Sequence, residues 1–165
     1  MKNLNSNNPC KIRDTNGEYH SVEPEELLSV AQQCIRQQLT NGEALDSAKS
    51  AKQYFQLQLG ALEREAFHAI WLDSQHRVIA LSEIARGTID SASIYPREVV
   101  KEALACNAAA VIFGHNHPSG LATPSECDKH ITKRLQDALA LVDVRVLDHL
   151  VVGENIASFA EMGLL

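Results

Sequence analysis

Long apolar runs are absent from this sequence. A membrane-spanning helix needs roughly 18 or more consecutive apolar residues, and no stretch of the chain approaches that length. The N-terminal segment MKNLNSNNPC also lacks the apolar core of a secretory signal. We therefore expect a cytoplasmic protein with no membrane partner.

Closely spaced cysteines are absent as well. The cysteines, at Cys10, Cys34, Cys106 and Cys127, form no C-x-x-C pair. This spacing gives no support for a cysteine-based zinc site, and thiols in the cytoplasm are normally kept reduced. The sequence predicts reduced thiols without a disulfide.

Positive charge is scarce. The chain has 15 Lys and Arg residues against 21 Asp and Glu residues, which gives a net charge of −6. Proteins that hold nucleic acid through its phosphates usually present a basic face, whereas the basic run here is limited to KHITKR at residues 129–134. The composition disfavours extensive duplex binding, although a local nucleic-acid contact stays open.

The sequence does contain enough apolar material for one core. Of its 165 residues, 45% are hydrophobic, which suits one domain with a small appendage. Residues 1–20 are polar and are expected to form a loose arm. Residues 24–39 predict a helix with an apolar stripe that includes Leu27 and Cys34. A second helix is predicted from residue 46 or 47 to residue 59.

The hydrophobic pattern changes after residue 60. Helical and strand-like spacings alternate in the order strand 66–73, strand 77–88, helix 95–107, strand 108–114, helix 125–142, strand 144–153 and a terminal element at 158–165. In helix 95–107 the inner face is expected to hold Val99, Val100, Ala103 and Leu104. The unbroken apolar strand 108–114 is expected at the centre of a sheet. This order predicts an α/β layer arrangement with a helical N-terminal attachment.

Two histidines stand at the end of the central strand. His115 and His117 are two residues apart, and on extended backbone such residues project from the same face. Asp128 follows in the first turn of the next predicted helix, which would pack back towards the strand end. Two imidazoles and one carboxylate leave the fourth position of a zinc ion for water, as in catalytic sites. Zinc lowers the pKa of such a water to about 7.

A capping motif explains part of the same segment. The letters SECD, at 125–128, fit a helix start in which Ser125 caps the helix and Asp128 supports the first turn. The preceding HPSG is typical of a turn. The two interpretations are compatible, because Asp128 could bind a metal while Ser125 caps. The combined spacing H-x-H-x7-S-x2-D is far more specific than either part alone.

This combined spacing resembles the signature of the JAMM (MPN+, JAB) metalloproteases, in which a glutamate precedes it. More narrowly, RGTIDSASIYPREVVKEAL, GHNHPSG, TPSECDKHIT and LDHLVVG resemble the RadC-like (UPF0758) bacterial branch. The resemblance covers about residues 62–165. It implies a JAB/MPN-type, cytidine-deaminase-like mixed sheet flanked by helices in residues 61–165, after a polar arm and helical extension in residues 1–60.

The resemblance also implies an activity, that of a zinc-dependent peptidase or isopeptidase with a peptide or ubiquitin-like protein as its substrate. It implies that His115, His117 and Asp128 are the zinc ligands. Ser125 would steady the attacking water and the oxyanion, and Glu65 would act as the general base.

The general base is the least determined of these positions. The family's glutamate precedes the first core strand, where EREAFHAIWL offers Glu65. A base must come within hydrogen-bond distance of the proton that it takes, and the sequence does not give that distance. Glu63, Glu83 and Glu98 are therefore kept as alternatives.

The polar residues outside the motif have simpler explanations. His68 and His149 would be packed histidines, Arg97 and Glu98 an ion pair, and Cys127 a small helix residue. A solvated helical face would explain Lys129, Lys133 and Arg134. The last three residues could instead form a patch for a substrate carboxylate or phosphate.

Two other functions compete with hydrolysis. Zinc deaminases carry H-x-E and P-C-x-x-C, but His117 and Ser125 stand where that glutamate and the first cysteine would be, so deamination is disfavoured. RadC-like proteins carry a DNA-repair label, and longer members have a helix-hairpin-helix segment whose Gly-centred hairpins are missing from residues 1–60. The alternative function is a DNA repair or recombination accessory protein that binds metal without hydrolysis.

Overall fold

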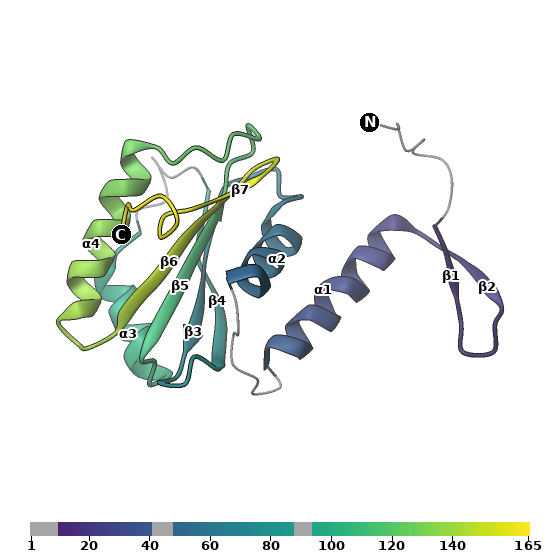
Figure 1. Ribbon diagram of the computed structural model, residues 1–165, viewed down its shortest axis with the longest axis horizontal. Helices are drawn as coiled ribbons and strands as arrows, with labels where there is room; N and C mark the ends of the chain where they lie inside the picture. The colour runs from purple at the N-terminus through teal and green to yellow at the C-terminus, as the bar shows by residue number, and fades with distance from the viewer. Residues whose placement is uncertain (1–9, 41–47, 88–93) are drawn as a thin grey trace.

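A five-stranded sheet forms the middle layer of the protein, with helices on both of its faces (Figure 1). The computed structural model describes residues 10–40, 48–87 and 94–165. In chain order the elements are β1 (Cys10–Arg13), β2 (Tyr19–Val22), α1 (Pro24–Thr40), α2 (Ala48–Leu59), β3 (Ala66–Leu72), β4 (Val78–Arg86), α3 (Pro96–Ala105), β5 (Ala110–Asn116), α4 (Glu126–Ala140), β6 (Arg145–Val152) and β7 (Ile156–Ser158). The predicted α/β class, with a mixed sheet flanked by helices, is confirmed.

The strand order in the sheet is β4-β3-β5-β6-β7. Strand β5 pairs in parallel with β6, whereas the pairs β3–β4, β3–β5 and β6–β7 are antiparallel. β5 is the central strand and all of its residues are buried, which confirms the expectation from its apolar run. Because two parallel neighbours need a crossover connection, α4 links β5 to β6 across one face of the sheet.

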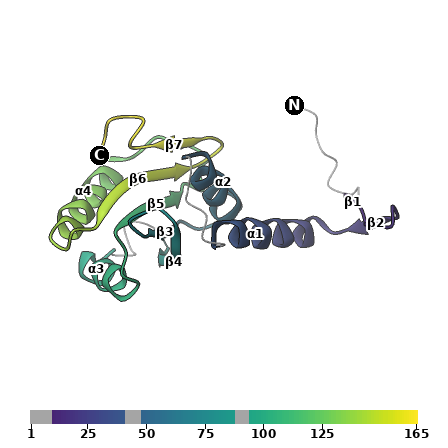
Figure 2. The ribbon, with the colours of Figure 1, turned by 60° about the horizontal axis from the view of Figure 1, so that its bottom comes forward.

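Helices α3 and α4 cover one face of the sheet, and α2 covers the other (Figure 2). Along β5, Phe113 faces α3 and α4, whereas Gly114 faces α2. A Cβ atom at Gly114 would lie 2.5 Å from the ring of Phe55 on α2, so glycine is needed for this close approach. Phe55 and Leu59 are fully buried, and burying each contributes about 1.5–3 kcal/mol. Helix α2 is therefore held firmly on the sheet that carries the histidines.

The segment expected as a loose arm, residues 1–20, contains most of a β-hairpin, so that expectation is wrong for residues 10–20. Strands β1 and β2 pair antiparallel. The turn is closed by Asp14, whose side chain accepts hydrogen bonds from the backbone N–H groups of Asn16 and Glu18. Most hairpin side chains are exposed, so the sequence has no alternation of apolar and polar residues from which these strands could be predicted. Residues 1–9 of the expected arm lie outside the described part of the chain.

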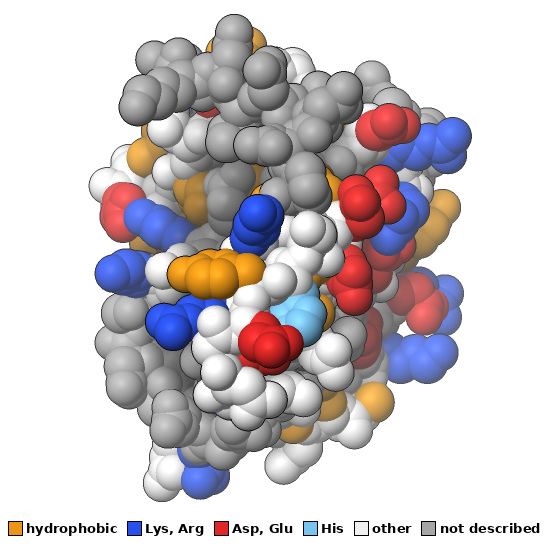
Figure 3. Space-filling model, turned by 90° about the vertical axis from the view of Figure 1, so that its right-hand side faces the viewer, with side chains coloured by type: hydrophobic (Ala, Val, Ile, Leu, Met, Phe, Trp, Pro, Cys, Tyr) orange, Lys and Arg blue, Asp and Glu red, His pale blue; other side chains and the backbone are white. Residues whose placement is uncertain are grey.

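Helix α1 leads from the hairpin to the three layers and confirms the helix predicted at 24–39 (Figure 1). It is joined to α2 by Gln32, whose side-chain amide donates to the Leu57 carbonyl oxygen at 2.7 Å. Leu27 and Cys34 of the expected apolar stripe are exposed, because much of α1 projects away from the layers. Figure 3 views this end of the molecule, where basic and acidic side chains are interspersed over the described surface.

Two further details differ from the prediction. Leu104, expected on the inner face of α3, is 58% exposed, whereas Val99 and Ala103 are fully buried. Val99 and Ala103 are four residues apart and so lie on the same, buried face of the helix. Leu104 is one residue further along and points away from that face. Strand β7 has no counterpart among the predicted strands, because a strand this short carries too little alternation to be detected.

The structure tests the expectations for the cysteines and for membrane-spanning helices. All four cysteines lie in the described part of the chain and are free thiols, as predicted. Among the described helices, none has the length and apolar character needed to cross a bilayer. The boundary expected between residues 60 and 61 stays a prediction.

Candidate metal centre

The two histidines lie where β5 leaves the sheet. His115 is opposite Phe67 of β3, and the two rings are stacked with their centroids 6.1 Å apart. His117 follows the strand, but its N–H still donates to the Val152 carbonyl oxygen of β6 at 2.8 Å, which continues the strand pairing. Residues two apart on such a backbone share a face. Both rings therefore project to the side of the sheet that α3 and α4 cover.

Asp128 is positioned by the start of α4. The Ser125 hydroxyl accepts a hydrogen bond from the Asp128 N–H at 3.1 Å. In return, Asp128 Oδ2 accepts hydrogen bonds from the Ser125 N–H and from its hydroxyl, each at 2.7 Å. This reciprocal pair is a capping box, so the predicted cap is confirmed. The cap also leaves Asp128 Oδ1 directed at His115.

Three ligand atoms converge between β5 and α4. The Nε2 atoms of His115 and His117 are 3.0 Å apart. His115 Nε2 lies 3.2 Å from Asp128 Oδ1, and His117 Nε2 lies 3.4 Å from Asp128 Oδ2. The side chains of His115 and Asp128 are closed off from solvent, whereas that of His117 is 13% exposed. The structure thus brings together all three residues predicted as metal ligands, and the cluster reaches solvent on the His117 side.

The protons around this cluster point away from its centre. His117 Nδ1 lies 2.7 Å from the Leu121 carbonyl oxygen, which can only accept, so a neutral His117 donates there and presents an unprotonated Nε2. Asp128 Oδ1 is buried and has no hydrogen-bond partner in the described part of the chain. Buried acceptors without a donor are rare and costly. A divalent cation would satisfy these lone pairs, so the residues fit a metal ion.

Asp128 is held as an anion. Burial raises the pKa of its carboxyl group, whereas the hydrogen bonds that Ser125 donates to Oδ2 lower it and favour the carboxylate. The carboxylate is therefore charged at neutral pH. Two imidazole nitrogens and one carboxylate oxygen form a donor set that suits zinc and several other divalent ions.

Comparison with known proteins identifies the family of this chain. Residues 45–164 match the family model of the RadC-like JAB domain. The chain belongs to this family. A UPF0758 protein of Vibrio cholerae serotype O1 is 53% identical to it over 140 residues, which cover 85% of this chain and 89% of that protein. Relatives of the same name in Leptothrix cholodnii and Cellvibrio japonicus are each 53% identical, over 84% and 87% of this chain. The matched regions cover 63% and 65% of those longer proteins.

In this RadC-like JAB domain, the segment that carries Glu65 is tied to the histidine strand. Asn116, between the two histidines, accepts a hydrogen bond from the Ala66 N–H at 2.9 Å and donates to the carbonyls of Leu62 and Arg64, each at 3.2 Å. These bonds hold the backbone on both sides of Glu65. Sequence reasoning missed Asn116, and the signal for it is an amide on an otherwise apolar strand.

Glu65 itself directly precedes β3 and is half-buried. Its carbonyl oxygen accepts a hydrogen bond from the Gly87 N–H at 2.8 Å. Phe67 of β3 is opposite His115 of β5, so the same antiparallel register, continued by two residues, brings Glu65 opposite His117. The Glu65 backbone therefore lies beside the end of β5 that carries the two histidines.

Glu83, the first alternative base, lies on the other face of the sheet. It is opposite His68 of β3 and forms an ion pair with Arg86. His68 alternates with Phe67, which stacks on His115, so His68 and Glu83 face α2. The hydrogen bonds from Arg86 also lower the pKa of the Glu83 carboxyl group, which makes it a weaker base.

Glu98, the second alternative, is exposed at the start of α3. It lies 3.7 Å from Arg97 and 3.5 Å from Lys101, which confirms the ion pair expected at this helix start. Cys127, next to Asp128, is an exposed residue of α4. Neither Glu98 nor Cys127 belongs to the converging cluster.

Two of the basic residues on α4 have acidic partners on the same helix. Lys129 lies 2.6 Å from Glu126, and Lys133 lies 2.8 Å from Asp137. Pairs at these spacings contribute only a few tenths of a kcal/mol, roughly 0.2–0.5. The solvated helical face is the interpretation that these contacts favour for this group.

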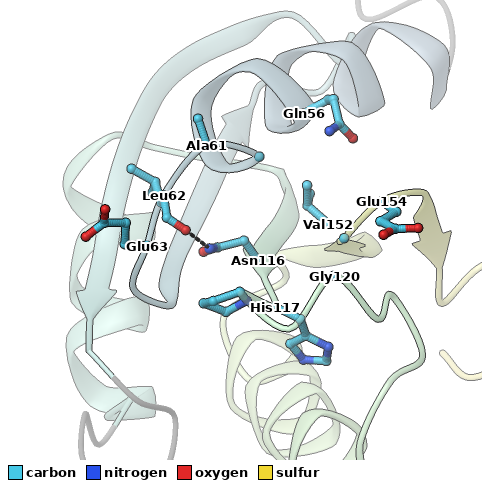
Figure 4. A pocket seen from close by; sticks show the side chains of 12 residues that line it. Gln56, Ala61, Leu62, Glu63, Asn116, His117, Gly120, Val152 and Glu154 are labelled. Carbon is cyan, nitrogen blue, oxygen red and sulfur yellow. Dashed lines mark hydrogen bonds between the residues drawn. The ribbon is translucent and has the colours of Figure 1, made fainter. Parts of the chain in front are cut away.

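A cavity of about 590 Å³ opens beside His117 (Figure 4). Its lining comes from the end of α2, the segment before β3, the loop after β5 and the turn after β6: Gln56, Gly60, Ala61, Leu62, Glu63, Asn116, His117, Pro118, Gly120, Val152, Gly153 and Glu154. The lining includes two acidic residues, Glu63, the third alternative base, and Glu154, and none of these described lining residues is Lys or Arg. In Figure 4 the Glu63 carboxylate points away from His117. The cavity gives a route from solvent to the exposed edge of the cluster.

His149 is buried, as expected of a packed histidine, but its position is more specific than that. Its Nε2 lies 2.8 Å from His115 Nδ1, on the side of that ring that faces away from Asp128. Burial lowers the pKa of His149 well below the ordinary value for histidine, so the ring is neutral at physiological pH. Sequence reasoning missed this contact, because it joins two strands that are far apart in the sequence.

Removing the Ser125 hydroxyl is expected to destabilise the protein by about 1 kcal/mol, because the first turn of α4 loses its cap. Ser125→Thr keeps a hydroxyl at the same position and serves as the matched control. Urea unfolding of the metal-free protein would measure both variants. Equal stability of Ser125→Ala and the unaltered protein would contradict the capping role.

Proposed function

We propose that this RadC-like JAB domain is a zinc-dependent peptidase or isopeptidase. His115, His117 and Asp128 would hold the ion. When bound, zinc supplies Lewis-acid activation of a water molecule and of the scissile carbonyl group. The observation that carries the proposal is the convergence of three lone-pair donors, all within 4.8 Å of one another, beside a cavity that a substrate could enter.

The proposed general base is Glu65. The position of Glu65 in the sheet favours this role, because the strand register that pairs Phe67 with His115 would next pair Glu65 with His117. Glu83 has its carboxylate on the opposite face, where Arg86 lowers its pKa. In the proposed reaction, the Glu65 carboxylate takes a proton from the attacking water and later delivers it to the leaving amine.

Ser125 has two roles in the proposal. Its hydroxyl donates a hydrogen bond to Asp128 Oδ2, with the two oxygens 2.7 Å apart, and so orients a proposed ligand. Rotation about the Cβ–Oγ bond would redirect this proton to a negatively charged substrate oxygen. Such a donor typically contributes a factor of about 10²–10³ to the rate in hydrolases.

The cavity beside His117 is the proposed site for the substrate. Its lining combines apolar side chains with the carboxylates of Glu63 and Glu154. An extended peptide, or the C-terminal tail of a ubiquitin-like protein, could reach the cluster along this route. The acidic lining favours substrate segments with positive charge.

The proposal is tested with purified, metal-analysed protein and a panel of fluorogenic peptides and ubiquitin-like fusion proteins. We expect about one tightly held zinc ion per chain, at the buried cluster of His115, His117 and Asp128. Asp14, Glu18 and His20 on the hairpin also lie within 4.8 Å of one another, but Glu18 and His20 are exposed. We also expect cleavage of at least one class of substrate, its loss on treatment with a chelator and its return when zinc is added.

Zinc binding without cleavage across the whole panel would contradict the hydrolase and favour a metal-binding interaction module. Well-folded protein that binds no zinc would contradict the metal centre itself. A His68→Gln variant is the control for zinc binding by a histidine outside the cluster, because His68 lies on the α2 face of the sheet. This variant is expected to leave the stoichiometry unchanged.

A further inference from the structure

A buried chain of hydrogen bonds lies behind His115. His115 Nδ1 and His149 Nε2 are 2.8 Å apart, and His149 Nδ1 lies 2.6 Å from the Thr132 hydroxyl. The same hydroxyl lies 2.6 Å from the Asp128 carbonyl oxygen. His149 belongs to β6 and Thr132 to α4, and both are buried. The chain therefore joins the ring of one proposed ligand to the backbone of another.

The direction of each proton follows from the last acceptor in this chain. A carbonyl oxygen only accepts, so Thr132 donates its single hydroxyl proton to Asp128. The hydroxyl must then accept from His149, which requires a proton on His149 Nδ1. The His149 ring is fully buried against aromatic rings, where a charge would be costly. It therefore carries one proton, on Nδ1, and its Nε2 accepts from His115 Nδ1–H. A neutral His115 then presents an unprotonated Nε2 to the cluster.

The other tautomer of His115 would block the site. It would put a proton on Nε2, 3.2 Å from Asp128 Oδ1, where a hydrogen bond could form in place of a metal bond. The chain of hydrogen bonds opposes that tautomer, because the lone pairs of His115 Nδ1 and His149 Nε2 would then face each other across 2.8 Å. The arrangement thus selects the tautomer that can bind an ion.

We propose that His149 and Thr132 are positioning residues that hold His115 in its metal-binding tautomer. This inference rests on the metal site of the proposed function and is independent of the reaction performed there. A ligating histidine generally donates its second N–H to an acceptor, and loss of that acceptor lowers metal affinity by about 10–100-fold. In this protein the acceptor is a second histidine, whose own proton is set by Thr132.

His149 also packs against aromatic rings, so a merely structural role must be separated from the positioning role. Its ring stacks on Phe159 with centroids 4.7 Å apart and meets Phe67 edge-on at 5.1 Å. Loss of packing would lower thermal stability without a specific effect on zinc affinity. Loss of the acceptor would weaken zinc binding even in a variant that stays folded.

Two pairs of variants separate these roles. Thr132→Val removes the hydroxyl at nearly constant volume, and Thr132→Ser restores it. His149→Leu removes the acceptor, whereas the side-chain oxygen of Gln in His149→Gln reaches the place of Nε2. Zinc affinity is measured by competition with a chromogenic chelator, and the thermal stability of the metal-free protein is recorded alongside it. We expect Thr132→Val and His149→Leu to bind zinc about 10–100-fold more weakly, and Thr132→Ser and His149→Gln to stay close to the unaltered protein.

Nuclear magnetic resonance of histidine-labelled, metal-free protein at alkaline pH gives a direct second readout. The ¹⁵N shifts of His115 are expected to report a protonated Nδ1 and an unprotonated Nε2, and Thr132→Val is expected to mix the tautomers. A protonated Nε2 in the unaltered protein would overturn the proposal, as would unchanged zinc affinity in both Thr132→Val and His149→Leu. If the unaltered protein binds no zinc, the proposed function fails, and the tautomer measurement still decides this inference.

Discussion

Asp128→Asn is expected to weaken zinc binding by more than about 100-fold, because loss of a ligand costs more than loss of a residue that hydrogen-bonds to a ligand, which costs about 10–100-fold. The substitution keeps the size of the side chain and an oxygen for the Ser125 N–H. It removes the carboxylate, which is the anionic ligand beside two imidazole ligands. Alanine at His115 should have the same effect on zinc, since it deletes a nitrogen ligand.

Thermal unfolding shows the effect on zinc binding most clearly. A ligand present at 100 times its Kd stabilises the folded state by about 2.7 kcal/mol, so zinc should raise the Tm of the unaltered protein. Zinc should leave the Tm of Asp128→Asn unchanged. In the absence of zinc the variant should be at least as stable as the unaltered protein, because an amide N–H can satisfy one of the histidine lone pairs that converge there.

Asp137→Asn is the matched control, because Asp137 lies on the same helix and pairs with Lys133 at the surface. This variant should keep the full zinc-dependent rise in Tm. A zinc-dependent rise of equal size in Asp128→Asn would show that the ion binds elsewhere, and it would remove Asp128 from the ligand set.

The candidate ligands could be predicted from the sequence because local geometry determines their directions. The i, i+2 alternation of an extended strand puts His115 and His117 on one face, and the N-cap at Ser125 puts Asp128 in the first turn of a helix. A helix that follows a central strand and crosses to a parallel neighbour must begin at the end of that strand. The convergence of the three side chains follows from these rules.

The residues that support the ligands could not be predicted in the same way. Asn116 binds the backbone of residues 62–66, about 50 positions earlier, and His149 approaches His115 from β6. Both contacts depend on which strands are neighbours and in which register, and apolar periodicity contains no information on either. Thr132 has the local role of a hydroxyl bonded to the carbonyl four residues before it. Its second contact, with His149, again needs the tertiary structure.

The errors in the fold have equally local causes. The β1–β2 hairpin depends on the turn at Asp14 rather than on apolar strands, so the sequence of residues 10–20 resembles a polar arm. The exposure of Leu27 arises because α1 projects from the layers instead of lying along them. An amphipathic pattern predicts that a helix has an apolar face, and it does not say whether another part of the chain covers that face.

Glu65→Gln is expected to keep zinc affinity and to lower kcat by about 10²–10⁴-fold, the usual contribution of a positioned general base. Glu65 is not among the converging ligand atoms, so the metal should bind as before. Glutamine preserves the shape of the side chain and its hydrogen-bonding reach but has no basic oxygen. The measurement is turnover of a substrate found in the panel, together with zinc content and Tm for the same preparation.

Two control variants make this prediction specific. Glu83→Gln should leave turnover unchanged, because Glu83 faces α2 and is paired with Arg86. Glu63→Gln should change KM more than kcat, because Glu63 lines the cavity rather than the cluster. Full turnover by Glu65→Gln would remove Glu65 from the mechanism. If Glu63→Gln instead abolished kcat with zinc still bound, the base would be the carboxylate that reaches His117 through the cavity, and the register argument from β3 would be wrong.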